Sequence, residues 1–70
     1  MFTIIVKPKL TATRLKNGMS IRSLAKKAGI NPTTVFKVSA GKCNATPTTA
    51  KKICEALGEK FDELFEVKEG

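Results

Sequence analysis

The side chains best suited to chemistry in this 70-residue sequence are amines and guanidinium groups, which bind anions. Of the thirteen basic residues, all but Lys60 and Lys68 lie between Met1 and Lys52, where there is no acidic residue. The six acidic residues lie between Glu55 and Glu69, and the net charge is +7. A partner with dense negative charge would therefore be attracted to the first part of the chain and repelled by the last.

The residue types in the sequence give little support to a catalytic or metal-binding function. The sequence has no histidine and no tyrosine, its carboxylates are confined to the C-terminal segment, and it has no glycine-rich phosphate loop. Cys43 and Cys54 have no histidine base, and two thiols at this spacing cannot complete a tetrahedral zinc site. We therefore expect no enzyme, no cofactor, no metal and no small-molecule substrate.

The length indicates a single domain over residues 1–70. Residues 2–6 are β-branched and aromatic, so they predict a short strand within an N-terminal arm, residues 1–7. This strand could pair with the alternating segment that starts at Phe65, within one chain or across a dimer. It is too short for a signal peptide or a membrane span, so we expect a soluble, cytoplasmic protein without a membrane partner.

Helix signals fill the rest of the sequence up to a tail at 66–70. A first helix is expected from about Lys9 to Asn17, with Leu15 as its main inward residue. The next four are expected from the Ser20 cap to Gly29, from the Asn31 cap to about Ala40, from a Thr46 or Thr48 cap to Gly58, and over 60–65.

The stretch from Ser20 to Gly41 is the most informative one. Its two helices are joined only by Gly29, Ile30 and Asn31, a turn so tight that the helices must cross steeply. A small residue, Ala25, lies where the helices approach each other. We expect Val35 and Val38 to anchor the second of these helices in the core.

The residues at these positions resemble the Cro/repressor (XRE-like) helix-turn-helix family of phages and bacteria over roughly residues 10–65. The resemblance rests on Leu24-Ala25, Gly29, Val35, Val38 and Gly41, followed by Ala50, Ile53, Ala56-Leu57-Gly58 and Leu64-Phe65. It implies an all-α, compact five-helix repressor-type domain with a central helix-turn-helix at residues 20–41. The short N-terminal β-strand, which could pair with the C-terminal end, is additional.

Two positions depart from the family pattern. The family often has an acidic residue where this chain has Ser39, and that acid commonly pairs with the basic residue matched here by Arg14. Arg14 must therefore find another partner, such as an acid of the C-terminal helix or a phosphate. Phe36 is a large apolar residue where family members usually carry a polar one.

The outward edge of the helix over 32–40 is the candidate recognition surface. At 100° per residue, Thr33 and Lys37 point away from Val35 and Val38, and Phe36 flanks them. Lys37 can donate to guanine O6 and N7, Thr33 can bond a base edge, and Phe36 could lie against a thymine methyl. Phe36 has a second interpretation, in which it packs beside the N-terminal strand as part of the core.

The resemblance adds further residues, because family members usually contact bases or the adjoining backbone at the positions of Pro32, Thr33, Thr34 and Lys37. The predicted base-contacting set is Pro32, Thr33, Thr34, Phe36 and Lys37. Phosphate contacts are expected from the groups that flank the groove, which are Ser20, Arg22, Asn31, Lys42 and Asn44.

Two functions are consistent with these features. The first is a sequence-specific regulator of transcription that binds double-stranded DNA, acting as a Cro-like repressor and homodimer on a partly palindromic operator. The alternative is a protein-interaction module, such as an antitoxin or adaptor, that keeps the fold without specific DNA readout. Dimerisation could use the N-terminal strand or the helix that carries Phe61, Leu64 and Phe65.

Overall fold

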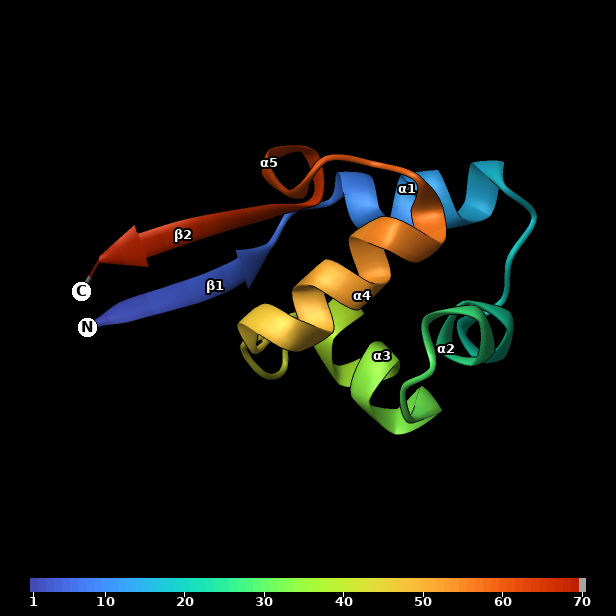
Figure 1. The fold of residues 1–70 in the computed structure, drawn as a ribbon, viewed down its shortest axis with the longest axis horizontal. Coiled ribbons are helices and arrows are strands. Elements are labelled where there is room, and N and C mark those ends of the chain that lie inside the picture. The colour runs from blue at the N-terminus through green and yellow to red at the C-terminus, as the bar shows by residue number, and fades with distance from the viewer. Residues whose placement is uncertain (70) are drawn as a thin grey trace.

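A computed structural model describes residues 1–69, which form five helices and one two-stranded sheet (Figure 1). In chain order the elements are β1 (Phe2–Val6), α1 (Lys9–Lys16), α2 (Ile21–Ala28), α3 (Pro32–Ser39), α4 (Pro47–Leu57), α5 (Phe61–Leu64) and β2 (Phe65–Glu69). The expected fold class is confirmed.

The helix boundaries follow from local capping. Ser20, Asn31 and Thr46 each accept a hydrogen bond from a backbone N–H in the first turn of α2, α3 and α4. Gly29 and Gly58 end α2 and α4 in the left-handed conformation, with φ of +73° and +67°. Of the two expected caps for α4, Thr46 is therefore the one used.

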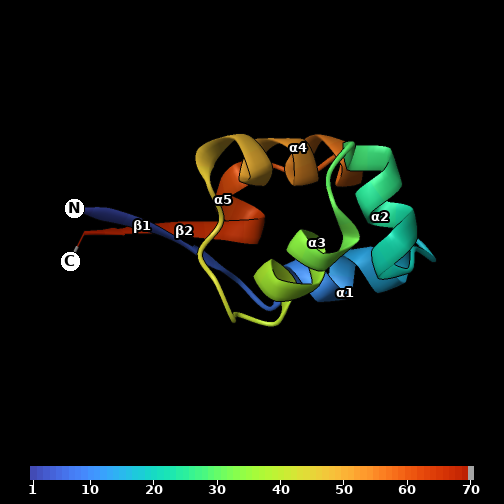
Figure 2. The same ribbon diagram turned by 90° about the horizontal axis from the view of Figure 1, so that it is seen from below.

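The core lies between α2, α3 and α4 and extends to α1 and α5 (Figures 1 and 2). α2 packs against both α3 and α4, and α5 packs against α1 and α4. The largest fully buried side chains are Phe65, Leu10, Leu24, Ile53, Leu64, Val35 and Val38. Among the described residues, no helix is long and apolar enough to cross a membrane.

Helix α1 is oriented differently from our expectation. Leu15 is 62% exposed, whereas Leu10 is fully buried and Thr13 is buried too. On a helix Leu15 lies about 140° from Leu10, so the two cannot face the same core. Leu10 occupies the inward position, and the prediction that Leu15 is the main inward residue is wrong.

β1 and β2 form an antiparallel ribbon that projects from the helices and carries both ends of the chain (Figure 1). Its register pairs Phe2 with Glu69, Ile4 with Val67 and Val6 with Phe65. The Lys7 N–H donates to the Leu64 carbonyl over 2.8 Å and extends this register by one pair. The predicted strand is confirmed, and it pairs with the C-terminal end within one chain.

The acidic C-terminal segment engages two of the basic residues near the N-terminus. Lys9 Nζ lies 3.0 Å from a carboxylate oxygen of Glu63 and 3.5 Å from one of Glu59. The hydrogen bond between Lys9 and Glu63 raises the pKa of Lys9 and lowers the pKa of Glu63. Lys7 Nζ donates to the Asp62 carbonyl over 2.7 Å. These two lysines therefore connect the chain at the start of α1 to α5 and the residue Glu59 before it, at the surface.

Arg14 obtains a backbone partner. Its Nη1 donates to the Met19 carbonyl over 2.7 Å, which ties α1 to the loop before α2. The partners expected for Arg14, a C-terminal acid or a phosphate, are therefore replaced by a carbonyl five residues further along the chain. Its Nε is buried without a hydrogen-bond partner among the described residues, and so is Ser39 Oγ.

Candidate nucleic-acid interface

The helix-turn-helix is held by hydrogen bonds at both ends of its turn. Gly29 has a φ of +73°, and the Ile30 N–H that follows it donates to the Ala25 carbonyl over 3.0 Å. Asn31 Oδ1 then accepts the Thr33 N–H over 2.7 Å, which starts α3. Pro32 occupies the first turn of α3, where its missing N–H leaves no bond unmade. The turn therefore fixes the direction of α3 relative to α2.

One face of α3 is anchored in the core. Val35 and Val38 are at most 1% exposed, and they face Leu24 and Ala25 within one apolar cluster. Ile30 packs against the same cluster from the turn. Because the inner face of α3 is fixed in this way, the opposite face has a defined orientation.

The opposite face of α3 carries the residues predicted to contact bases. Pro32, Thr33, Phe36 and Lys37 are exposed, and Thr34 is half-buried at the shoulder. Phe36 is 49% exposed and outside the core cluster, so the interpretation of Phe36 as a core residue is wrong. Within residues 1–69, no hydrogen bond or ion pair engages the side chains of Thr33 and Lys37. These side chains are free to contact a ligand.

Lys42 contributes to this face from the loop after α3. Its Nζ lies 5.5 Å from the centroid of the Phe36 ring, a distance at which a cation is attracted to an aromatic face. The sequence placed Lys42 at the flank of the recognition surface, but it gave no indication of this contact. The pair combines a positive charge and an apolar ring in one exposed patch.

The residues predicted to contact phosphates are all exposed at the surface. Ser20 uses its hydroxyl to cap α2, since Oγ accepts the Ser23 N–H over 3.1 Å. Arg22 follows in the first turn of α2. Asn31 uses Oδ1 to cap α3, so the amide nitrogen of Asn31 remains available as a hydrogen-bond donor. Asn44 also lines a groove beside β1, so it belongs to a second surface as well as to the predicted phosphate-contacting set.

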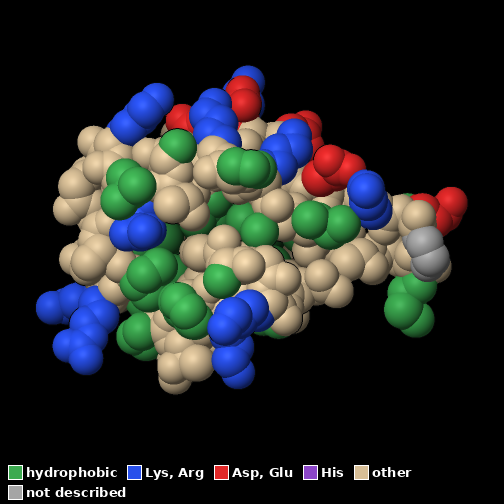
Figure 3. Space-filling model, turned by 180° about the vertical axis from the view of Figure 1, so that it is seen from behind, with side chains coloured by type: hydrophobic (Ala, Val, Ile, Leu, Met, Phe, Trp, Pro, Cys, Tyr) green, Lys and Arg blue, Asp and Glu red, His purple; other side chains and the backbone are tan. Residues whose placement is uncertain are grey.

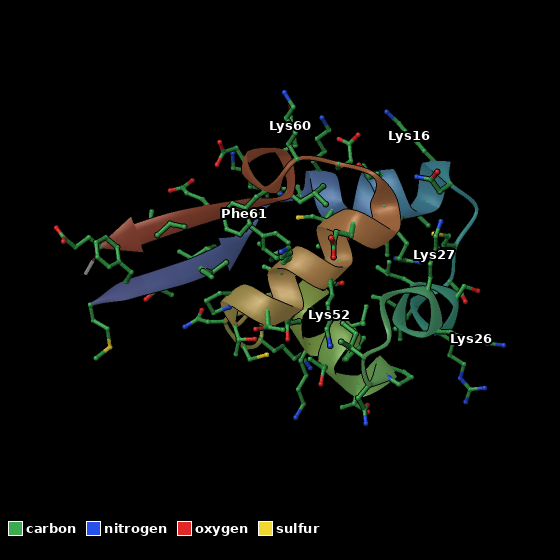
Figure 4. All side chains as sticks on the ribbon, in the orientation of Figure 1. Lys16, Lys26, Lys27, Lys52, Lys60 and Phe61 are labelled. Carbon is green, nitrogen blue, oxygen red and sulfur yellow. The ribbon has the colours of Figure 1, made fainter. Side chains whose placement is uncertain are left out.

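The charge distribution separates this face from the rest of the molecule. Acidic side chains lie along the edge formed by the C-terminal elements, and the part that carries α2 and α3 shows basic, apolar and uncharged polar groups but no acidic ones (Figure 3). Lys26 and Lys27 project from α2 away from α3 (Figure 4). They add to the positive potential around the face without belonging to the α3 surface.

The sequence matches the helix-turn-helix family HTH_3 over residues 10–64, so the chain belongs to this family. The XRE-type resemblance seen in the sequence is thereby confirmed. Members of this family are non-enzymatic DNA-binding domains, which agrees with the expectation that the chain is not an enzyme.

Solved structures with the same fold include three regulatory proteins. The restriction-modification controller protein C.AhdI from Aeromonas hydrophila is 27% identical, with a TM-score of 0.74 over 79% of this chain and 83% of its own. The clp gene regulator ClgR from C. glutamicum is 22% identical, with a TM-score of 0.69 over 77% of this chain and 70% of its own. The transcriptional regulator VanUg is 23% identical, with a TM-score of 0.72 over 97% of this chain and 91% of its own. A comparison with curated protein sequences gives no significant match.

Proposed function

We propose that this protein is a cytoplasmic transcriptional regulator that binds a specific site in double-stranded DNA. The observation that carries the proposal is the exposed, acid-free face of α3, held rigidly by a buried inner face. Family membership and the likeness to a restriction-modification controller support it. We further propose that it acts as a Cro-like repressor and a homodimer on a partly palindromic operator, because two helices one DNA turn apart, about 34 Å, double the contacts to a short site.

In this proposal α3 enters the major groove, which is about 12 Å wide. Lys37, at the centre of the exposed face, donates to a guanine. Thr33 contacts a base edge in the first turn, with Pro32 and Thr34 beside it at the groove wall. Phe36 lies against a thymine methyl, and the ammonium of Lys42 over its ring reaches the neighbouring phosphate.

The phosphate contacts come from both sides of α3. The N-terminal turn of α2 offers backbone N–H groups at Ser20 and Arg22, where the helix dipole favours an anion. On the other side of α3, phosphates of the DNA backbone are contacted by Asn31, Lys42 and Asn44. Such contacts orient the protein on the duplex and raise affinity for every sequence equally.

The test compares Lys37→Ala with Lys42→Ala on a selected operator and on random duplex DNA. Lys37→Ala should lower the preference for the operator, because a good base contact contributes about 1–3 kcal/mol of discrimination. Lys42→Ala should weaken both duplexes alike and make the salt slope shallower by about one unit. Lys60→Ala, which removes the same charge beside the acidic segment, is the matched control and should change neither property.

The second candidate function, a protein-interaction module, is favoured by one observation, the 49% exposure of Phe36. Salt distinguishes the two functions, since DNA binding weakens with a slope of about −0.9 per phosphate contacted. Affinity for a protein partner bound through the apolar ring of Phe36 would depend little on salt concentration. Failure to bind any duplex at low ionic strength would eliminate the regulator proposal.

A further inference from the structure

The open edge of β1 is a surface that the proposed DNA contacts do not use. In an antiparallel pair, residues that exchange hydrogen bonds alternate with residues that do not. Lys7 bonds to Leu64 across the ribbon, so Ile5 and Thr3 also direct their backbone groups toward β2. Phe2, Ile4 and Val6 therefore point their N–H and C=O groups outward, away from β2.

The two edges of the ribbon differ in charge. β2 carries Glu66, Lys68 and Glu69, and charged side chains of this kind discourage further strand pairing. β1, with the sequence Phe-Thr-Ile-Ile-Val, has no charged residue, no proline and no glycine. It is thus the unprotected edge. A two-stranded ribbon is also marginally stable on its own, so it gains from additional strands.

An apolar groove of about 890 Å³ lies beside this edge, between β1 and α4. Phe2, Ile4 and Val67 line it from one face of the ribbon, and Ala45 and Pro47 line it from the start of α4. Phe2 is 68% exposed and Val67 is 51% exposed, so the apolar face of the ribbon is largely uncovered in a single copy.

We propose that the occupant of this edge and groove is a second copy of the same chain. Two β1 strands pair antiparallel with Ile4 on a two-fold axis, which gives a four-stranded sheet in the order β2-β1-β1-β2. Phe2, Ile4 and Val6 of each copy then exchange all their outward backbone bonds with Val6, Ile4 and Phe2 of the other. This inference names the surface of the proposed homodimer and rests on that part of the proposed function.

Charge argues for a second copy and against nucleic acid at this site. Glu55 and Glu59 line the groove against one lysine, Lys51, and β2 carries Glu66 and Glu69 against Lys68, so the excess of negative charge disfavours phosphates there. The basic faces of two copies with a net charge of +7 would repel each other, whereas the uncharged β1 strands do not. The charged β2 strands become the outer edges of the enlarged sheet, as edge protection requires.

The proposed symmetry also points α2 in the same direction in both copies. A two-fold axis that relates antiparallel strands of one sheet runs perpendicular to the sheet. The strands of the ribbon lie side by side in Figure 1 and overlap in Figure 2, so this axis follows the viewing direction of Figure 1. Helix α2 is seen end-on in Figure 1 and therefore runs along the same axis. Both copies would present the N-terminus of α2 to the same side, where one duplex can meet both.

The test uses chemically synthesised protein in which a single backbone N–H is methylated. N-methylation at Ile4 removes the outward donor at the centre of the proposed interface, whereas N-methylation at Val67 removes the equivalent donor from the outer edge of β2. Sedimentation equilibrium without DNA should show the unmodified chain passing from 7.6 kDa to twice that mass with rising concentration. Methylation at Ile4 removes two hydrogen bonds per dimer, worth about 1 kcal/mol each, and should raise the dimer dissociation constant at least about thirtyfold.

Methylation at Val67 should leave the dissociation constant unchanged, and circular dichroism should show that both modified chains are folded. A chain that stays monomeric at millimolar concentration would overturn the inference, and so would a dimer that is lost on methylation at Val67 but kept on methylation at Ile4. Binding to a single half-site is measured in parallel. A monomeric chain that still binds the half-site would refute the proposed dimer surface and leave the DNA-binding proposal intact. A dimer that binds no DNA would refute the DNA-binding proposal and leave the dimer surface intact.

Discussion

Ser39 occupies a position where the polar side chain has no visible benefit. It is the last residue of α3, and its Oγ is buried without a hydrogen-bond partner among the described residues. A buried hydroxyl that loses its bond to water costs about 1–3 kcal/mol, and alanine is a better helix former by about 0.5 kcal/mol. Replacement by alanine also removes the contacts of one oxygen atom, which offsets part of the gain. We expect Ser39→Ala to stabilise the fold by about 1 kcal/mol.

For a domain of this size, such a gain raises the Tm by about 4–8 °C. Thermal unfolding followed by circular dichroism measures the shift, and urea unfolding checks it at constant temperature. Affinity for DNA should stay unchanged, because Ser39 lies on the inner side of α3. A loss of stability in Ser39→Ala would refute the reasoning, since it would mean that Oγ has a partner in the folded protein.

Ser39→Glu extends the same argument to Arg14. In the family that the sequence resembles, an acid at this position commonly pairs with the basic residue matched by Arg14, whose Nε is buried without a partner here. A charge-assisted bond contributes about 1.5–3 kcal/mol before desolvation of the carboxylate is subtracted. The pairing would lower the pKa of the new carboxyl in the folded protein. The added stability should therefore be fully present above the pKa that this carboxyl has in the unfolded chain, and it should be lost as the pH falls through the lower pKa of the folded protein. Ser39→Gln is the uncharged control and should show no such pH dependence.

Three further outcomes test the packing and the backbone. Leu10→Ala should lower the free energy of unfolding by about 2–5 kcal/mol, whereas Leu15→Ala, at a position that is 62% exposed, should change it by less than about 0.5 kcal/mol in urea unfolding. Gly29→Ala should cost about 1–2 kcal/mol from its φ of +73° alone, with an unchanged circular dichroism spectrum, because no atom lies within 4 Å of the added carbon. Iodoacetamide at pH 8 should label the exposed Cys43 quickly and the buried Cys54 slowly. Burial raises the pKa of Cys54 and so reduces the fraction of this thiol present as thiolate. Equal labelling rates would contradict the buried position of Cys54.

Local signals account for what the sequence predicted well. The caps at Ser20 and Asn31 and the left-handed glycine at Gly29 depend on the conformation of two or three residues, which side-chain chemistry decides on its own. The exposed edge of α3 follows from the same kind of argument, because the inward positions of Val35 and Val38 determine where the remaining residues point.

Long-range contacts account for what it missed. The orientation of α1 depends on how it meets α5, and a helix with one leucine in each of its two turns offers no clear stripe. Lys9 is one of the basic residues in the first part of the chain, but it pairs with Glu63, 54 residues away. The cation over Phe36 depends on the path of the loop that carries Lys42, and no sequence period encodes such a path.

Stability and the proposed recognition of DNA depend on different faces of α3, and this separation has a consequence for how specificity can change. Val35 and Val38 hold the helix, while Thr33 and Lys37 on the other face make no hydrogen bond or ion pair within residues 1–69. Substitutions on the outer face therefore alter the contacts available to a ligand at little cost in folding. Asn31 is the exception, because the side chain proposed to bind a phosphate is also the cap that starts α3. The outer face can diversify freely, whereas its N-terminal boundary is constrained by the fold itself.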